Sequence, residues 1–241
     1  DGSNDVIGVD VYVRGTQIST DASNPTSFKY DGEIFDGTPS IFQNHATYPL
    51  TEADNILVTY YSTINDKKPI PVPTDPGDYI VKLTLVNISD GVEVEYVLGD
   101  TLFYFTIEKG DLDNSKIYWQ YTHTDGKGNT TTAVWDGTEW KNTADGMPIT
   151  EFSYDEYAHT VELVSEDENL TVTATKNKAN IHAGKYTSTA LLSYESTKWN
   201  APTAPTSFEW EVKKAVLDMS FINWVYDNYE YTISGGEPKK I

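Results

Sequence analysis

The chain has 241 residues, a formal net charge of −20 from 37 acidic and 17 basic residues, and no cysteine. Its single arginine is Arg14. Because nucleic acids and anionic membranes are bound mainly through clusters of Arg and Lys, this composition argues against binding to either. No apolar run reaches the ~18–20 residues of a membrane span, so we predict no membrane insertion. Without cysteine, the chain has neither disulfides nor thiolate catalysis.

The N-terminal part of the chain has the alternation of antiparallel strands. Every second residue from Tyr79 to Leu85 is apolar, and Phe103, Phe105 and Ile107 continue the pattern in the next segment. Alternate residues of a strand point to opposite faces of a sheet, so one face is expected to be buried and the other wet. Short strands separated by Gly, Pro, Asn and Asp predict an all-β sandwich or barrel.

A phrase of the sequence occurs twice. Residues 103–119 read FYFTIEKGDLDNSKIYW, and residues 208–224 read FEWEVKKAVLDMSFINW. Leu112 and Leu217, which stand at matching places in the two phrases, are 105 residues apart. Since solenoid repeats span only about 20–50 residues, this spacing indicates tandem domains. We expect the two leucines to occupy equivalent buried positions.

The repeat defines the predicted domain organisation. We predict one β-sandwich unit in residues 1–110 and a second in residues 111–217. Residues 218–241 would be the first strand of a truncated third unit, with Val225–Ile233 as that strand. Each full unit is long enough to bury its own core, whereas the last segment is too short to do so.

Other short segments that match between the two units show where each unit carries an insertion. The phrase FKYDGE around Tyr30 matches FSYDEY around Tyr154. The interval from Tyr30 to Gly77 is 47 residues, against 30 from Tyr154 to Gly184, so unit one contains 17 extra residues. In unit two, residues 119–154 form an insertion rich in aromatic residues.

This second insertion predicts a hairpin and a candidate binding surface. Two strand-like segments flank the turn DGKGN, and a second turn precedes Trp140. Aromatic rings bind the apolar faces of sugars, and polar neighbours bind sugar hydroxyls. The candidate residues of such a carbohydrate platform are Trp135, Trp140, Tyr121, His123 and Asp136. Among them, Trp140 is the best candidate for a ring exposed to solvent.

The same aromatic residues have a purely structural interpretation. Trp119 recurs as Trp224 in the repeated phrase, which indicates a core position. Trp135 and Trp140 would then cap one end of the sandwich instead of facing a ligand. The sequence leaves both interpretations open, and the exposure of the two rings distinguishes them.

No motif predicts a metal site, a cofactor or an enzyme. The histidines His45, His123, His159 and His182 are scattered, with no pair at the spacing of zinc ligands. In the DGKGN turn, Lys127 stands where a calcium loop needs an oxygen ligand. The sequence lacks G-x-S-x-G, H-E-x-x-H and P-loop patterns, so we predict that the chain is not an enzyme.

These repeated phrases resemble the MBG-type, immunoglobulin-like repeats of Gram-positive cell-surface proteins. Unit two carries the resemblance at Trp119, Tyr154, Asp155, His159, Ala183–Tyr186 and Trp210–Ala215. Unit one carries it at Tyr30–Gly32, Gly77–Tyr79 and Ile107–Lys109. Glu156 and Pro76 depart from the pattern, because they stand where Gly and Ala are usual.

The resemblance implies tandem immunoglobulin-like antiparallel β-sandwiches in an exported protein. We therefore predict a non-catalytic fragment of a bacterial surface protein, extracellular and associated with the cell wall, that acts as a spacer or adhesive repeat. The alternative is a carbohydrate-binding module of a system that degrades or adheres to polysaccharides. Its partners would be neutral glycans or proteins of host or cell surfaces. A hydrolase domain ranks below both interpretations.

Overall fold

The protein is almost entirely β-structure. The computed structural model describes residues 6–43, 56–64, 68–85, 97–98, 101–216, 223–226, 229–232 and 239–240. These residues contain no α-helix and one short 3-10 helix, η1 (Asn114–Lys116). The prediction of an all-β, sandwich-like fold is confirmed.

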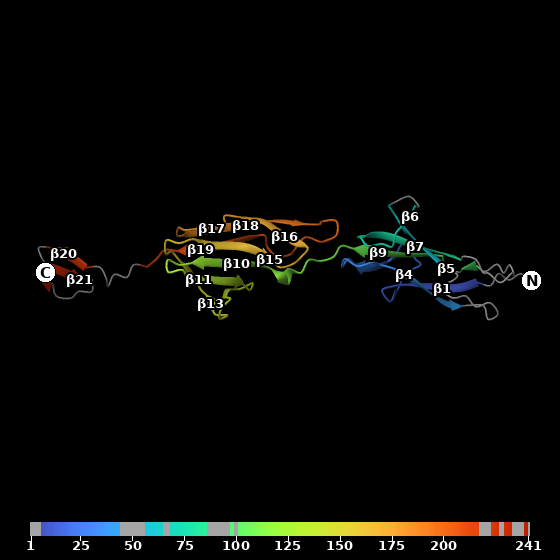
Figure 1. Cartoon of the computed structure of the whole chain (residues 1–241), viewed down its shortest axis with the longest axis horizontal. Coiled ribbons are helices and arrows are strands. Elements are labelled where there is room, and N and C mark those ends of the chain that lie inside the picture. Colours follow the sequence, from blue (N-terminus) through green and yellow to red (C-terminus); the bar gives the residue numbers. More distant parts are fainter. Residues whose placement is uncertain are drawn as a thin grey trace, which may run out of the picture. The chain divides into compact units, whose positions relative to one another are not determined.

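The chain divides into two compact units. Unit 1 comprises residues 1–112 together with 194–202, and unit 2 comprises residues 113–193 and 203–241. The two layers of strands in each unit can be followed in Figure 1. Within unit 1, the ring of Trp199 meets Tyr30 edge-on, with 5.1 Å between the ring centroids.

Unit 1 contains two sheets among its described residues. The first has the order β2-β1-β4, and β8 pairs parallel to β1. Its strands are β1 (Val6–Val13), β2 (Thr16–Gln17), β4 (Gly37–Gln43) and β8 (Val97–Leu98). The second has the order β3-β9-β7-β5-β6. Its strands are β3 (Thr26–Lys29), β5 (Ile56–Ser62), β6 (Pro69–Ile70), β7 (Gly77–Leu85) and β9 (Leu102–Glu108).

Alternating apolar residues from both sheets form the core of unit 1. In the first sheet β1 buries Val9, Val11 and Val13. The second sheet supplies Tyr79, Val81 and Leu83 from β7 and Phe103, Phe105 and Ile107 from β9. The alternation in these two strands is therefore confirmed. Its physical basis is the two-residue period of a strand, which places all these side chains on one face.

In unit 2, two sheets lie within residues 113–213, and a further three-stranded sheet, described below, lies within residues 223–240. One has the order β13-β12-β11-β10-β15-β17. Its strands are β10 (Ile117–Thr124), β11 (Thr130–Trp135), β12 (Trp140–Asn142), β13 (Pro148–Ile149), β15 (His159–Ser165) and β17 (Ala179–Asn180). The other has the order β14-β19-β18-β16. Its strands are β14 (Phe152–Ser153), β16 (Leu170–Lys176), β18 (Gly184–Tyr194) and β19 (Ser207–Lys213).

The inserted segment of unit 2 forms the predicted hairpin. Strands β10 and β11 pair antiparallel from Gln120↔Val134 to Thr124↔Thr130. The turn between them is closed by Asp125, whose Oδ1 accepts hydrogen bonds from the backbone N–H groups of Lys127 and Asn129. The hairpin continues through β12 and β13, so the insertion extends the sheet of β10 instead of standing apart from the sandwich.

The two units repeat the same local pairing. In unit 1, β3 runs parallel to β9, and Tyr79 lies opposite Phe105. In unit 2, β14 runs parallel to β19, and Tyr186 lies opposite Trp210. Each tyrosine hydroxyl donates to the backbone carbonyl four residues earlier, at 2.7 Å for Tyr79 and 2.6 Å for Tyr186. Both units therefore contain the same tyrosine corner, in which a tyrosine hydroxyl binds the backbone just upstream of its strand.

Residues 218–241 differ from the predicted single strand. They contain β20 (Asn223–Tyr226), β21 (Tyr229–Thr232) and β22 (Lys239–Lys240), which pair antiparallel in that order. The prediction of one strand across 225–233 is wrong. Asp227 and Asn228 in its middle are turn-forming residues, which favours two short strands over one long strand. Leu217 lies outside the described residues, whereas Leu112 is buried as expected.

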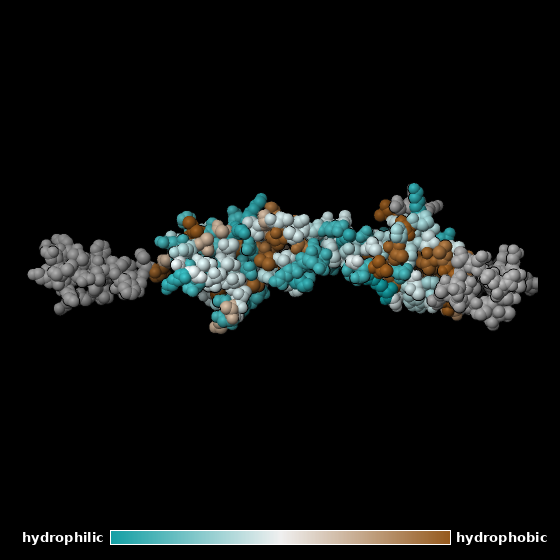
Figure 2. Space-filling model, in the orientation of Figure 1, coloured by the Kyte–Doolittle hydropathy of each residue, from teal (hydrophilic) through white to brown (hydrophobic). Residues whose placement is uncertain are grey.

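The visible surface is largely hydrophilic. Figure 2 shows polar residues over much of both units, with apolar residues in smaller groups between them. In the part of the chain that the structure describes, no helix has the length and apolar character needed to cross a membrane.

Candidate functional site

The Tyr-Asp phrase forms the same turn in both units. The carboxylate of Asp31 accepts a hydrogen bond from the backbone N–H of Glu33 at 3.0 Å. The carboxylate of Asp155 accepts one from the N–H of Tyr157 at 3.1 Å. The next residue adopts the left-handed conformation in each case, with φ of 90° at Gly32 and 76° at Glu156. The turn leaves each carboxylate with further acceptor sites, and the two units use them differently.

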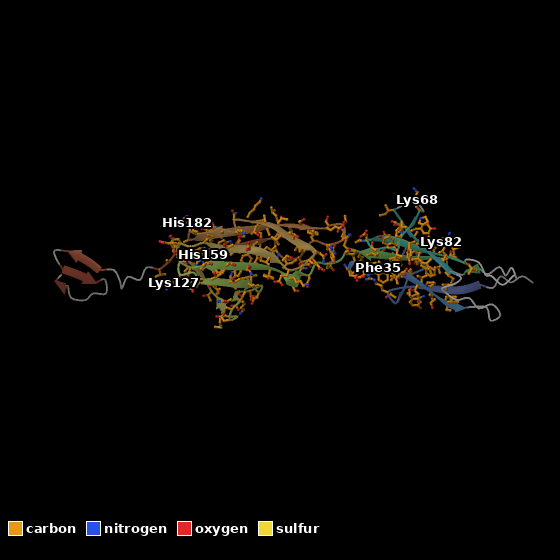
Figure 3. All side chains as sticks on the ribbon, viewed as in Figure 1. Phe35, Lys68, Lys82, Lys127, His159 and His182 are labelled. Atoms are coloured by element: carbon orange, nitrogen blue, oxygen red, sulfur yellow. The ribbon has the colours of Figure 1, made fainter. Side chains whose placement is uncertain are left out.

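In unit 1 the carboxylate of Asp31 binds a guanidinium. Arg14 follows β1, and its Nη1 and Nη2 donate to the two oxygens of Asp31 at 2.6 and 2.9 Å. The Cζ atom of Arg14 lies 3.7 Å from the ring centroid of the buried Phe35, which is labelled in Figure 3. This bidentate contact holds the pKa of Asp31 below its ordinary value, because it favours the charged carboxylate.

In unit 2 the carboxylate of Asp155 faces two imidazoles. His123 Nε2 lies 2.8 Å from Asp155 Oδ2, and His159 Nε2 lies 3.5 Å from Asp155 Oδ1. His123 comes from β10 and His159 from β15, where they are directly opposite in the antiparallel register. Their rings stack with centroids 4.2 Å apart and an angle of 6° between the planes.

Each imidazole also has a partner at its other nitrogen. His123 Nδ1 lies 3.1 Å from the backbone oxygen of Ala158. His159 Nδ1 lies 2.8 Å from the hydroxyl of Tyr121. His159 is 1% exposed, and its Nε2 makes no hydrogen bond. Burial lowers the pKa of His159, with repulsion from His123 the next cause.

The donor atoms of this cluster are close enough to share one ion. One atom each from His123, Asp155 and His159 lies within 4.8 Å of the others. The prediction that the histidines are scattered is therefore wrong for this pair. Sequence spacing suggested no site because the two histidines are 36 residues apart, whereas strand pairing makes them neighbours. The available signal was His159 in the Tyr-Asp phrase and His123 in the adjacent hairpin strand.

The predicted aromatic platform is largely interior. Trp140, expected to be the most exposed ring, is only 8% exposed, and Tyr121 is 3% exposed. Tyr121 stacks on Phe152 with 3.8 Å between centroids, and Trp140 meets both rings edge-on. The expectation of an exposed Trp140 is wrong, because β12 extends the sheet and places this ring against the opposite sheet of unit 2.

The other two predicted platform residues have structural contacts. Trp135 is half-buried and meets Phe208 edge-on at 5.2 Å between centroids. Asp136 is exposed, and its Oδ1 accepts hydrogen bonds from the N–H groups of Thr138 and Glu139 and from the Thr138 hydroxyl. These bonds lower the pKa of Asp136 to about 2 and commit its Oδ1 to the turn. The structural interpretation of Trp119 is confirmed, since this ring is 2% exposed.

The five predicted residues therefore separate into two groups. Tyr121, Trp135 and Trp140 join one aromatic cluster, and His123 lies beside Tyr121 with 6.4 Å between ring centroids. Asp136 belongs to the turn between β11 and β12. Instead of Asp136, the carboxylate that contacts His123 is Asp155, which the platform prediction did not include.

The arrangement around Asp155 supports cation binding more directly than stacking on a sugar. It offers two imidazole nitrogens and a carboxylate, which together suit a transition-series divalent cation. Comparison with protein-family models, curated proteins and solved structures found no match. The resemblance to MBG-type repeats therefore stays a prediction.

Proposed function

We propose that the chain is a non-catalytic segment of an exported bacterial surface protein, where its two immunoglobulin-like units act as a spacer or adhesive repeat. The observation that carries this proposal is the repeated tyrosine corner. Tyr79 and Tyr186 each bond to the carbonyl four residues back and lie opposite an aromatic residue of the next strand. Tyrosine corners that bond to upstream backbone are a feature of immunoglobulin-like sandwiches.

The internal organisation of each unit also suits a spacer. Within each unit, strands far apart in the chain close a core of its own, as β3 with β9 and β14 with β19 show. Extending a unit from its ends therefore requires the hydrogen bonds between these distant strands to break. This arrangement supports a load-bearing role in a surface array.

Force spectroscopy tests the spacer proposal. The chain would be pulled from its two ends, and each unit of about 100 residues should release roughly 30–35 nm of chain, since an extended residue spans about 3.3–3.6 Å. We expect two such events per molecule. Unfolding in a single event, or at forces too low to measure, would contradict a load-bearing role.

A binding measurement tests the adhesive and carbohydrate alternatives. Neutral polysaccharides would be screened by affinity electrophoresis with the wild type, Trp135→Ala and Asp136→Ala. The half-buried Trp135 is the ring of the predicted platform that retains exposure, so it is the residue through which stacking on a sugar would occur. Retardation of the wild type that Trp135→Ala abolishes would favour the carbohydrate-binding module over a pure spacer.

The proposed location is tested on intact cells. Brief protease treatment of the source bacterium, followed by mass spectrometry of the released peptides, should yield peptides of this chain. Release only after lysis would contradict a place at the cell surface.

A further inference from the structure

We propose that unit 2 binds one divalent cation of the transition series, with zinc the best suited, through His123, Asp155 and His159. Their donor atoms converge within 4.8 Å of one another. Imidazole nitrogen with carboxylate oxygen is a donor set that zinc takes in proteins, and hard cations such as calcium prefer oxygen alone. This site is independent of the spacer role, and it would give one of the two units a bound metal ion.

The contacts of His123 leave one of its ring nitrogens mismatched when the imidazole is neutral. Both ring nitrogens of His123 face an acceptor, the carbonyl of Ala158 at 3.1 Å and the Asp155 carboxylate at 2.8 Å. A neutral imidazole has one N–H and can donate to only one of them. If Nδ1–H donates to Ala158, the lone pair of Nε2 points at a carboxylate. Either a second proton or a metal ion between Nε2 and Asp155 resolves this conflict.

His159 presents the same kind of unsatisfied atom from the other side. Its side chain is buried, and Nε2 is without a hydrogen bond although Asp155 Oδ1 lies 3.5 Å away. Buried polar atoms are satisfied in most native structures, so each exception needs a physical reason. A metal ion between the two rings and Asp155 would satisfy both Nε2 atoms. A proton on His159 Nε2 would face Asp155 Oδ1 only at 3.5 Å, which is long for a hydrogen bond.

The outer contacts are those of metal-binding histidines. Such histidines donate the N–H of their second nitrogen to a carbonyl, carboxylate or hydroxyl, which fixes the ring and its tautomer. His123 has the Ala158 carbonyl in this place, and His159 has the Tyr121 hydroxyl. Zinc bonds of about 2.0–2.1 Å set tetrahedral donors roughly 3.3 Å apart. The two ring planes are only 6° apart, so the rings must turn from their stacked arrangement before both Nε2 atoms can bind one ion.

Unit 1 shows what a cation does at the equivalent turn. There the guanidinium of Arg14 neutralises Asp31 and ties the Tyr-Asp turn to the end of β1. Unit 2 has His123 and His159 against the matching Asp155. A bound metal would therefore tie this turn to β10 and β15, as Arg14 ties its counterpart. The same structural task would be done by a fixed side chain in one unit and by an exchangeable ion in the other.

Isothermal titration of the metal-free full chain with Zn²⁺ in about 0.15 M NaCl tests the proposal, because that salt screens diffuse attraction to the acidic surface. We expect one equivalent of Zn²⁺, removed by EDTA. Zinc at about 100 times its Kd should raise one thermal transition by roughly 10 °C. Co²⁺ in place of Zn²⁺ should give the visible absorption of a tetrahedral site, and Ca²⁺ should bind without saturation.

Two variants remove ligands, and one serves as a matched control. His123→Ala and Asp155→Asn should weaken Zn²⁺ binding by at least about 100-fold. Asn keeps the Oδ1 acceptor for the turn, so Asp155→Asn leaves the fold in place. His182→Ala removes an exposed imidazole of the same unit outside the cluster (Figure 3) and should bind as the wild type does. Circular dichroism checks that each variant is folded.

Imidazole NMR gives a readout that does not depend on stability. In the wild type, Zn²⁺ should shift the Nε2 resonances of both His123 and His159 and leave His182 unchanged. The proposal is overturned if neither resonance responds, if the wild type lacks a stoichiometric site, or if Asp155→Asn binds Zn²⁺ as tightly as the wild type. A doubly protonated His123 that is insensitive to Zn²⁺ would show that a proton alone bridges the pair.

Discussion

Glu156 is the residue whose backbone conformation least suits its side chain. It has a φ of 76°, and the matching position in unit 1 is Gly32 with a φ of 90°. Left-handed backbone costs an L-residue roughly 1–2 kcal/mol, of which the greater freedom of Gly in the unfolded chain offsets about 0.5–1 kcal/mol. Glu156→Gly should therefore stabilise unit 2 by about 0.5–1 kcal/mol in urea unfolding.

The reverse substitution in unit 1 is the matched control. A Cβ at Gly32 would meet no atom within 4 Å, so Gly32→Ala changes only the backbone preference. It should destabilise unit 1 by about 1 kcal/mol. If both substitutions leave stability unchanged, the left-handed turn is not a source of strain in this protein.

Arg14 sets the titration of Asp31. Its hydrogen bonds lower the pKa of that carboxyl, so the contact stabilises the folded state above the unfolded pKa of about 3.9. This stabilisation is lost as the pH falls through the folded pKa. Arg14→Gln should raise the pKa of Asp31 in a carboxyl NMR titration. Asp21 is the internal control, because hydrogen bonds from Ser23 lower its pKa and should be unaffected. An unchanged Asp31 would show that Arg14 does not hold the turn in solution.

At the scale of elements, the β11–β12 hairpin depends on one buried ring more than on its neighbour. Trp140 packs against Tyr121, Phe152 and Phe208, whereas Trp135 is half-buried. Removing a buried Trp side chain costs about 3–5 kcal/mol. Trp140→Ala should reach this range in urea unfolding followed by circular dichroism, and Trp135→Ala should cost less than half as much. Equal losses of unfolding free energy in the two variants would contradict the deeper burial of Trp140.

Pairing of strands also explains which parts of the site the sequence could predict. The alternation in β10 and β15 predicts which side chains share a face, since a strand has a period of two. It does not predict which residue of another strand lies opposite. His123 and His159 come together only because β10 and β15 pair in one register, and a shift of one residue would send one of them to the other face.

At the scale of the whole molecule, two cores predict two unfolding transitions. Phe105 in unit 1 and Trp210 in unit 2 lie at matching positions, each opposite the tyrosine of its corner. Both are buried, so replacing either by alanine should cost about 3–5 kcal/mol. In differential scanning calorimetry Phe105→Ala should lower one transition and Trp210→Ala the other. A single transition lowered by both variants would show that the two units unfold as one.

The amino-acid sequence by itself determined the all-β class, the alternation of buried side chains in β7 and β9, the β10–β11 hairpin and the repeat of the Tyr-Asp and tyrosine-corner phrases. These features depend on local periodicity and turn residues, which neighbours along the chain specify. Only the tertiary structure decided that Trp140 is buried and that His123, Asp155 and His159 meet. Both outcomes depend on contacts between strands distant in sequence, because packing of the sheets and their register place these side chains.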